Sequence, residues 1–200
     1  QFDASGDQRD ATQSTSSHRP TVATPSSFGG RQVGQPDIVD DSMDLTVPDL
    51  PNEATLITVA DEGPIDKNRG WLEYYAESQG VNSGVNLYGG AAGSSITRGQ
   101  VFDGSNITAS TNAQSGIAVL AMTYKNGSLR LYRDGVEVAL SSPGDLGNAL
   151  DRLILYSLPD FQDNYVAKGD GMGAVFSFNT ELNTSQVNNI TNLLNSWYNL

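Results

Sequence analysis

The sequence predicts an all-β fold, a sandwich or barrel of antiparallel strands that ends in one short α-helix. Three observations predict it. Short apolar and β-branched segments recur along the 200 residues, separated by Gly, Pro, Asn and Asp. Two tight-turn dipeptides, Asn126-Gly127 and Asp134-Gly135, lie eight residues apart between such segments. Only the final segment changes to a helical period.

The first 36 residues are polar and rich in turn-forming residues. A run of Ser and Thr at 14–17, Pro20, Pro25 and Gly29-Gly30 interrupt any hydrophobic period. The stretch 1–36 is therefore expected to be loop with at most a short pairing strand. Composition alone leaves a flexible linker as an equal alternative. The chain 1–200 as a whole is expected to be a single domain.

Strands are predicted at 54–60, 71–77, 85–88 and 95–98. The second of these alternates strictly. One of its faces is wholly apolar, with Leu72, Tyr74 and Ala76, and is expected to be the inner face. The other face carries Trp71, Glu73, Tyr75 and Glu77.

The sequence gives its clearest prediction of secondary structure in the region 116–140. Residues 117–124 are almost continuously apolar, as expected of a strand that is covered on both faces. Asn126-Gly127 and Asp134-Gly135 tolerate the positive φ angles of type I′ turns, whose twist matches a hairpin. They predict a three-stranded meander. Two further strands are expected at 152–158 and 173–178.

The last segment predicts an amphipathic helix. Its apolar side chains recur at intervals of three and four: Val187, Ile190, Leu193, Leu194 and Trp197. Asn183 stands in the N-cap position of a capping box, with Gln186 three residues on. Trp197 and Tyr198 are expected to pack against the sandwich.

Charge and composition exclude several classes of function. The chain has 11 Lys+Arg against 23 Asp+Glu, a formal net charge of −12, and no basic cluster. It is therefore expected to bind neither nucleic acid nor anionic membrane surfaces. Membrane insertion is not expected either, since no apolar run reaches the ~18–20 residues of a membrane helix. The absence of cysteine removes disulfides, thiolate zinc and thiol catalysis.

No catalytic residues and no cofactor are predicted. A Ser-His-Asp site or a histidine metal site needs more than the single His18, which is expected to be a surface residue. Calcium is the one metal left open, because it needs only oxygen ligands. Its candidate ligands are Asp37, Asp40, Asp41 and Asp44, with solvated acidic loops as the favoured alternative.

A glycan-binding face would need aromatic platforms beside amides and carboxylates. The candidates are Trp71, Tyr75 and Tyr88. Trp71 and Tyr75 share a predicted strand face with Glu73, but a second sheet over that face would make them core residues. The core alternative is the favoured one.

Several motifs, in order along the chain, resemble one known superfamily. Near the start these are Phe2–Gly6 (FDASG), Asp10–Thr15 (DATQST) and Arg19–Thr21 (RPT). In the second half these are Asn126–Val138 and Lys168–Asn183, followed by the helix to Trp197-Tyr198. Together they resemble laminin-G-like domains of the concanavalin A-like jelly-roll superfamily. The opening motif is similar to that of phage virion proteins. The chain departs from the pattern at Pro36–Ile38, where the superfamily usually has Phe-Asp-Gly.

The resemblance implies a two-sheet jelly roll with a C-terminal helix. It implies a non-enzymatic module on a virion surface: a capsid decoration, head fibre or tail-associated protein. Such a module would contact host-surface glycans, neighbouring virion subunits or copies of itself. The alternative is a carbohydrate-binding or degenerate glycanase module of a secreted bacterial protein. The E-x-D-x-x-E pattern of jelly-roll glucanases is absent, since Glu73 and Glu77 have no aspartate between them. A purely architectural subunit is a third reading.

Overall fold

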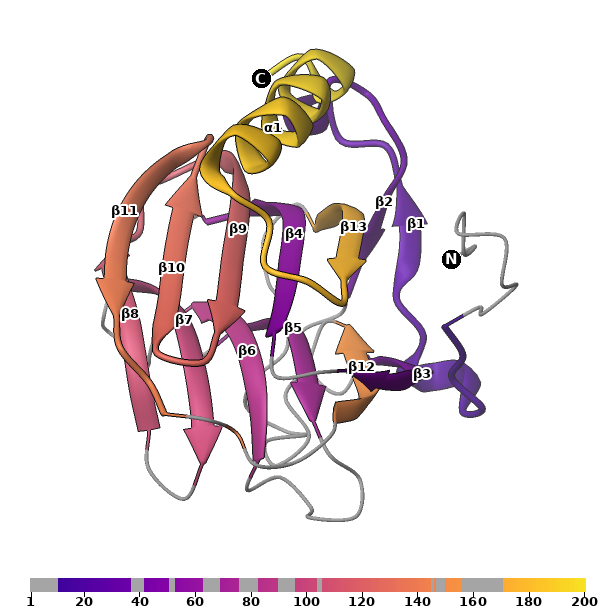
Figure 1. The fold of residues 1–200 in the computed structure, drawn as a ribbon. Coiled ribbons are helices and arrows are strands. Elements are labelled where there is room, and N and C mark those ends of the chain that lie inside the picture. The colour runs from indigo at the N-terminus through magenta and orange to yellow at the C-terminus, as the bar shows by residue number, and fades with distance from the viewer. Residues whose placement is uncertain are drawn as a thin grey trace.

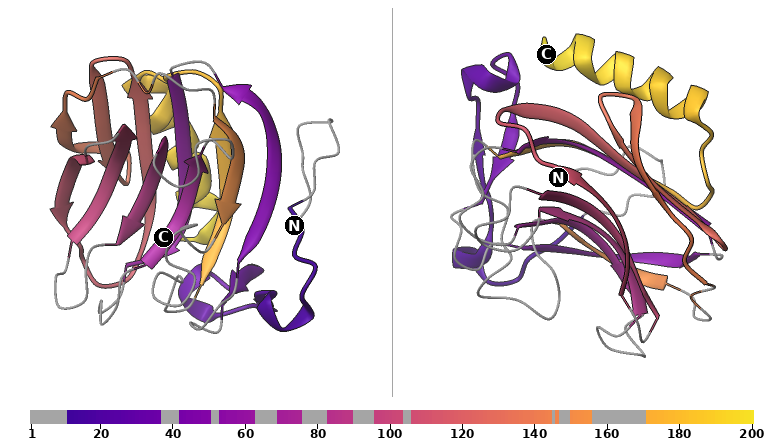
Figure 2. Two further views of the ribbon diagram at one scale, coloured as in Figure 1. Left: turned by 90° about the horizontal axis from the view of Figure 1, so that it is seen from below. Right: turned by 90° about the vertical axis from the view of Figure 1, so that its left-hand side faces the viewer.

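The protein folds as two facing antiparallel β-sheets with one C-terminal helix, as the sequence predicted (Figure 1). The computed structural model describes residues 11–36, 42–50, 53–62, 69–75, 83–89, 96–103, 106–144, 146, 150–155 and 171–200. Seen along the sheets, the molecule has two β layers, and the helix lies over the outer side of one of them (Figure 2, right).

The first layer is a seven-stranded sheet with the order β1-β2-β13-β4-β9-β10-β11. Its strands are β1 (Thr21–Ala23), β2 (Val33–Gln35), β13 (Met172–Phe178), β4 (Glu53–Asp61), β9 (Ile117–Lys125), β10 (Ser128–Arg133) and β11 (Val136–Ser141). Two short 3-10 helices, Ser16–His18 and Ser26–Phe28, lie before and after β1.

The second layer is a six-stranded sheet with the order β3-β12-β5-β6-β7-β8. Its strands are β3 (Met43–Leu50), β12 (Leu150–Leu155), β5 (Arg69–Tyr75), β6 (Ser83–Gly89), β7 (Ile96–Asp103) and β8 (Asn106–Asn112). The strands in both sheets pair antiparallel throughout the described ladders.

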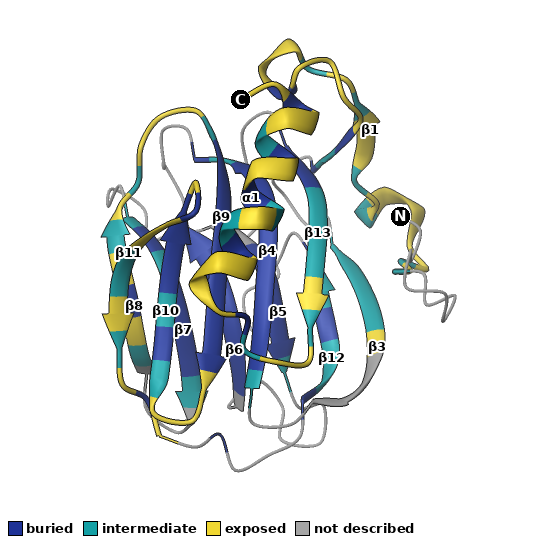
Figure 3. Cartoon of the chain, turned by 45° about the horizontal axis from the view of Figure 1, so that its top comes forward, coloured by how far each residue is buried: buried dark blue, intermediate teal, exposed yellow. Residues whose placement is uncertain are grey.

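The hydrophobic core has two parts because the seven-stranded sheet is covered on both faces. On β9, Leu120 and Met122 point into the space between the sheets, whereas Val119 and Ala121 point towards the helix. Figure 3 shows β4, β9 and β10 as largely buried and the outer side of the helix as exposed. This confirms the expectation that the apolar strand 117–124 is covered on both sides.

The helix α1 (Thr184–Tyr198) begins at the predicted capping box. Asn183 Oδ1 accepts the Gln186 N–H at 3.0 Å, and Gln186 Oε1 accepts the Asn183 N–H at 2.9 Å. Its buried side is formed by Val187, Thr191, Leu194 and Tyr198. The expected packing of Leu193 and Trp197 is wrong, since they are 63% and 55% exposed. The buried stripe follows positions 187, 191, 194 and 198, which places residues 193 and 197 on the outer side.

The predicted meander is confirmed, but only one of its turns has the predicted geometry. Asp134 and Gly135 have φ angles of +49° and +82°, as a type I′ turn requires. At the other turn only Gly127 has a positive φ, +81°, while Asn126 does not. The expectation of a type I′ turn is therefore wrong there.

Two edge strands were not predicted from the sequence. In β3 the inward side chains are Met43 and Leu45, and the intervening Asp44 is polar. The other, β8, is polar except at Ile107 and Ala109. Edge strands tolerate such polar sequences because one side of the strand faces solvent. No helix within the described ranges is long and apolar enough to cross a membrane.

Candidate functional site

The predicted ligand-binding tyrosines lie on the outer face of the six-stranded sheet, the face turned away from the other sheet. Cross-strand pairing places Glu73 beside Asn86 and Asn86 beside Gln100. These three polar side chains are only 3%, 1% and 3% exposed. On the same face, Tyr88 is 7% exposed and Tyr75 is half-buried. This face is therefore largely closed to solvent and offers little surface to a ligand.

Trp71 belongs to the core, which was the favoured alternative. The pairing of β5 with β6 shifts register between Gly70 and Leu72, so Trp71 is the extra residue of a β-bulge. The bulge turns the indole inwards, where it packs in the same cluster as Leu72 and Tyr74 with no exposed surface. Strict alternation would have left Trp71 beside Glu73. The bulge therefore removes Trp71 from the outer face.

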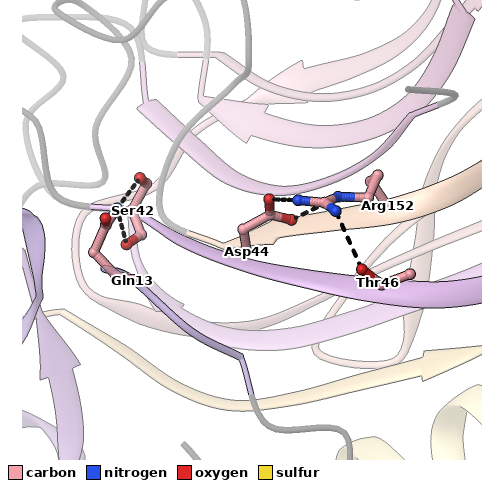
Figure 4. Close-up of polar contacts among 5 residues, drawn as sticks. All are labelled: Gln13, Ser42, Asp44, Thr46 and Arg152. Atoms are coloured by element: carbon pink, nitrogen blue, oxygen red, sulfur yellow. Dashed lines mark hydrogen bonds and ion pairs between the residues drawn. The ribbon is translucent and has the colours of Figure 1, made fainter. Parts of the chain in front are cut away.

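The calcium candidate Asp44 is engaged by an arginine. Asp44 Oδ2 is paired with Arg152 Nη2, and Arg152 Nε donates to Asp44 Oδ1 at 3.2 Å (Figure 4). The guanidinium also donates to Thr46 Oγ1 at 3.1 Å. Both Asp44 oxygens thus bind a cation that the protein itself supplies. Asp37, Asp40 and Asp41 lie outside the described residues, among which no group of three potential metal ligands occurs.

A buried ion pair at one end of the seven-stranded sheet is hydrogen-bonded to the six-stranded sheet. Glu62, just after β4, pairs with Arg133 on β10, and the two side chains are 1% and 7% exposed. Thr97 on β7 donates its hydroxyl to Glu62. Arg133 also donates to the Asn112 carbonyl at 3.0 Å. This network connects the layers, and the sequence contains no spacing that would have predicted it.

A pocket of about 620 Å³ opens at the edge of the sandwich, beside β1, β2 and the start of β3. Its apolar lining comes from Ala11, Pro20, Val22, Val33, Met43 and Ala174. Its polar lining comes from Thr12, Gln13, Arg19, Gln32 and the hydroxyl-bearing Tyr198, with Gly34 and Gly173 completing the wall. We call this the edge pocket.

The N-terminal segment forms one wall of the edge pocket because it is hydrogen-bonded to β3. Thr12 exchanges two backbone hydrogen bonds with Asp44, at 2.8 and 3.0 Å. The Gln13 amide donates to the Ser42 carbonyl and hydroxyl at 3.3 and 3.2 Å (Figure 4). Arg19 Nε in turn donates to the Gln13 carbonyl at 2.6 Å. Each polar residue of this wall is thereby held in place.

The opposite wall is built by β13 and the end of α1. Tyr198 Oη accepts the Ala174 N–H at 2.7 Å, and its ring packs edge-on against Phe28. Gly173 makes room for that ring, since a Cβ there would lie 2.6 Å from the hydroxyl oxygen. Burial raises the pKa of Tyr198, which keeps its hydroxyl protonated.

The edge pocket combines an apolar floor with hydroxyl, amide and guanidinium groups, and its described lining includes no carboxylate. This suits a ligand with both C–H surface and polar groups. The pocket is not predicted from the sequence, because residues 1–36 have no hydrophobic period and are expected to be loop. The signal was present nonetheless, since Ala11–Gln13 and Arg19-Pro20 are the motif residues that carried the superfamily resemblance.

No protein-family model matches the sequence, and no curated protein matches it. Solved structures do share its fold. Domain 4 of AbnA, an extracellular arabinanase from Geobacillus stearothermophilus in complex with arabinotriose, has a TM-score of 0.69 at 13% identity, covering 95% of this chain and 92% of that one. The Ruminococcus gnavus IT-sialidase CBM40 bound to α2,3-sialyllactose has a TM-score of 0.55 at 11% identity, covering 72% and 84%.

The botulinum neurotoxin serotype C1 binding domain has a TM-score of 0.66 at 11% identity, over 96% of this chain. The protein spans about half (49%) of that toxin chain. These likenesses establish the class of fold, a jelly-roll-like β-sandwich shared with binding domains of carbohydrate-active proteins and toxins.

Proposed function

We propose that this protein is a glycan-binding module and that the edge pocket is its binding site. The observation that carries the proposal is the pocket itself. Its volume of about 620 Å³ lies within the ~300–1,000 Å³ of small-molecule sites. The arabinotriose and sialyllactose bound by two proteins of the same fold support a sugar as the ligand.

The chemistry of the pocket fits a sugar ring. The half-buried side chains of Met43 and Ala174 offer apolar surface to the C–H face of a pyranose or furanose. The Thr12 hydroxyl and the exposed Gln32 amide offer donors and acceptors to its hydroxyls.

We propose binding without turnover. Glycoside hydrolysis by the common mechanisms needs two carboxyl groups on either side of the scissile bond. The described lining of the edge pocket offers none. The proposed role is therefore recognition by hydrogen bonds and apolar contact.

Two settings for this module are proposed. The first, suggested by the opening motif, is a virion surface, where the module contacts host glycans, neighbouring virion subunits or copies of itself. The second is a secreted bacterial protein, as for the extracellular arabinanase of the same fold. Mass spectrometry of purified virions and of culture supernatant distinguishes the two settings. Enrichment of the protein in virions supports the first, and enrichment in the supernatant supports the second.

A glycan array followed by calorimetry tests the function. Val22→Trp fills the mouth of the edge pocket without touching the core, because Val22 is 72% exposed. Val136→Trp is the matched control, at a 65% exposed position on β11 away from the pocket lining. We expect Val22→Trp to weaken the best array ligand about tenfold or more and Val136→Trp to leave it unchanged. A silent array, or full binding by Val22→Trp, contradicts the proposal.

A further inference from the structure

Arg19 lines the edge pocket, and among the described residues only its Nε has a hydrogen-bond partner. Its Nε donates to the Gln13 carbonyl at 2.6 Å, and Gln13 is itself anchored to Ser42 at 3.2 and 3.3 Å. This chain of bonds fixes the stem of an otherwise exposed side chain. The two Nη groups remain, and together they form the planar fork that binds a carboxylate with two parallel hydrogen bonds.

The other arginines with described side chains all have partners. Arg130, Arg133 and Arg152 pair with Glu137, Glu62 and Asp44, respectively. Arg31 stacks on Trp197 at 4.3 Å, and Arg98 lies over the Tyr88 ring at 5.9 Å. Arg19 has no carboxylate partner within the described part of the chain, although the protein has 23 acidic residues. Within the described residues this guanidinium has no acidic partner and it lines a pocket, which suits an anion supplied by a ligand.

The charges around the pocket permit such an anion. Arg19 is the single charged residue among the described residues that line it. Asp44, whose backbone is hydrogen-bonded to Thr12 in the pocket wall, is paired with Arg152. The net charge of −12 acts at long range and is screened beyond about 8 Å at physiological salt. The Arg19 guanidinium therefore has more influence than the net charge of the protein on whether a carboxylate binds in the edge pocket.

We propose that the ligand of the edge pocket is an acidic sugar, a sialic or uronic acid, whose carboxylate is bound by the Arg19 fork. This inference rests on the proposed glycan-binding function and specifies its ligand class. The apolar floor takes the uncharged part of the sugar, while Thr12 and Gln32 take its hydroxyls. Neutral sugars can occupy the same space but leave the guanidinium without its anion.

Isothermal titration with paired sugars tests the inference. The probes are 3′-sialyllactose against lactose, and galacturonic acid against galactose. The first member of each pair carries a carboxylate that the second lacks. The variants are Arg19→Gln, which removes the charge, and Arg19→Lys, which keeps the charge but loses the fork. Arg130→Gln is the matched control, since it removes the same charge from an exposed residue on β10 that does not line the pocket. Thermal melts confirm that each variant is folded.

We expect the wild-type protein and Arg130→Gln to bind at least one acidic sugar about tenfold or more tightly than its neutral partner. Arg19→Gln should abolish that difference, and Arg19→Lys should retain part of it. Added NaCl should weaken only the acidic ligand. Equal binding of acidic and neutral sugars, or an unchanged preference in Arg19→Gln, overturns the inference and leaves the glycan-binding function intact. Binding of neither pair also overturns it, and the glycan array then decides whether the function fails as well.

Discussion

Replacing Glu62 with glutamine tests the buried ion pair with Arg133, whose hydrogen bonds reach the six-stranded sheet. The change keeps the size of the side chain and removes its charge. Arg133 then remains 7% exposed without a carboxylate, since its other contact is the carbonyl of Asn112. Among the described residues, Arg133 Nε has no hydrogen-bond partner even in the unaltered protein. The variant therefore leaves a buried cation uncompensated.

The expected loss of stability is large because removing one partner of a buried pair destabilises by about 3–5 kcal/mol. For a domain of this size each kcal/mol lowers Tm by about 2–4 °C, so the melting temperature should fall by roughly 6–20 °C. The exposed pair Arg130–Glu137 provides the control, with side chains 38% and 33% exposed. Glu137→Gln should lose no more than about 1 kcal/mol.

Urea unfolding of both variants, followed by tryptophan fluorescence, measures the difference. A double variant, Glu62→Gln with Arg133→Met, completes a double-mutant cycle. We expect the double variant to recover most of the stability lost in Glu62→Gln, because the uncompensated charge is gone. The reasoning is refuted if Glu62→Gln and Glu137→Gln lose the same stability, or if the two changes at 62 and 133 are simply additive.

Three further predictions concern the turns, the helix and pH. Gly135→Ala should destabilise more than Gly127→Ala in urea unfolding. Both glycines have φ near +80°, so an alanine at either position costs about 1–2 kcal/mol of backbone strain. Only at position 135 does the new Cβ also meet another atom, Asn188 Oδ1 at 2.7 Å. Equal losses of stability in the two variants would contradict this. Leu194→Ala should lose about 2–5 kcal/mol and the 63% exposed Leu193→Ala almost nothing, and the reverse order would show that the helix packs differently. Glu53 has a pKa below its ordinary value, because a backbone N–H and Lys125 stabilise its charged form. Its contribution is therefore present at neutral pH and lost as pH falls through that lowered pKa, so Glu53→Gln should flatten the acid side of a stability–pH curve; an unchanged slope would contradict it.

The elements that the sequence predicted are those with a strong local signal. The strand 117–124, the Asp134-Gly135 turn and the Asn183 cap each depend on neighbours in the chain, and the structure has all three. The strand β8 and the bulge at Trp71 are defined by pairing with the neighbouring strands β7 and β6, and neither has a distinctive pattern in its own sequence. A polar edge strand has no hydrophobic period of its own, and a bulge breaks the period on which the prediction rests.

The candidate site was harder to predict than the fold because it is assembled from distant segments. Thr12, Arg19, Met43 and Tyr198 meet only when the N-terminal segment pairs with β3 and α1 reaches β13. Exposed aromatic residues on a strand are typical of a glycan-binding surface, which is why Trp71, Tyr75 and Tyr88 were the predicted candidates. Trp71 and Tyr88 proved to be buried, however, and burial depends on tertiary packing that no local pattern reports.

Chemical-shift mapping by NMR tests most directly whether the edge pocket is the glycan site. A ¹⁵N-labelled sample is titrated with the tightest ligand from the glycan array. We predict that the largest shifts fall on the backbone amides of Thr12, Gln32 and Gly173, with little change at Asn86 and Gln100 on the outer face of the six-stranded sheet. Shifts centred on that outer face, with the edge-pocket amides unmoved, would contradict the account.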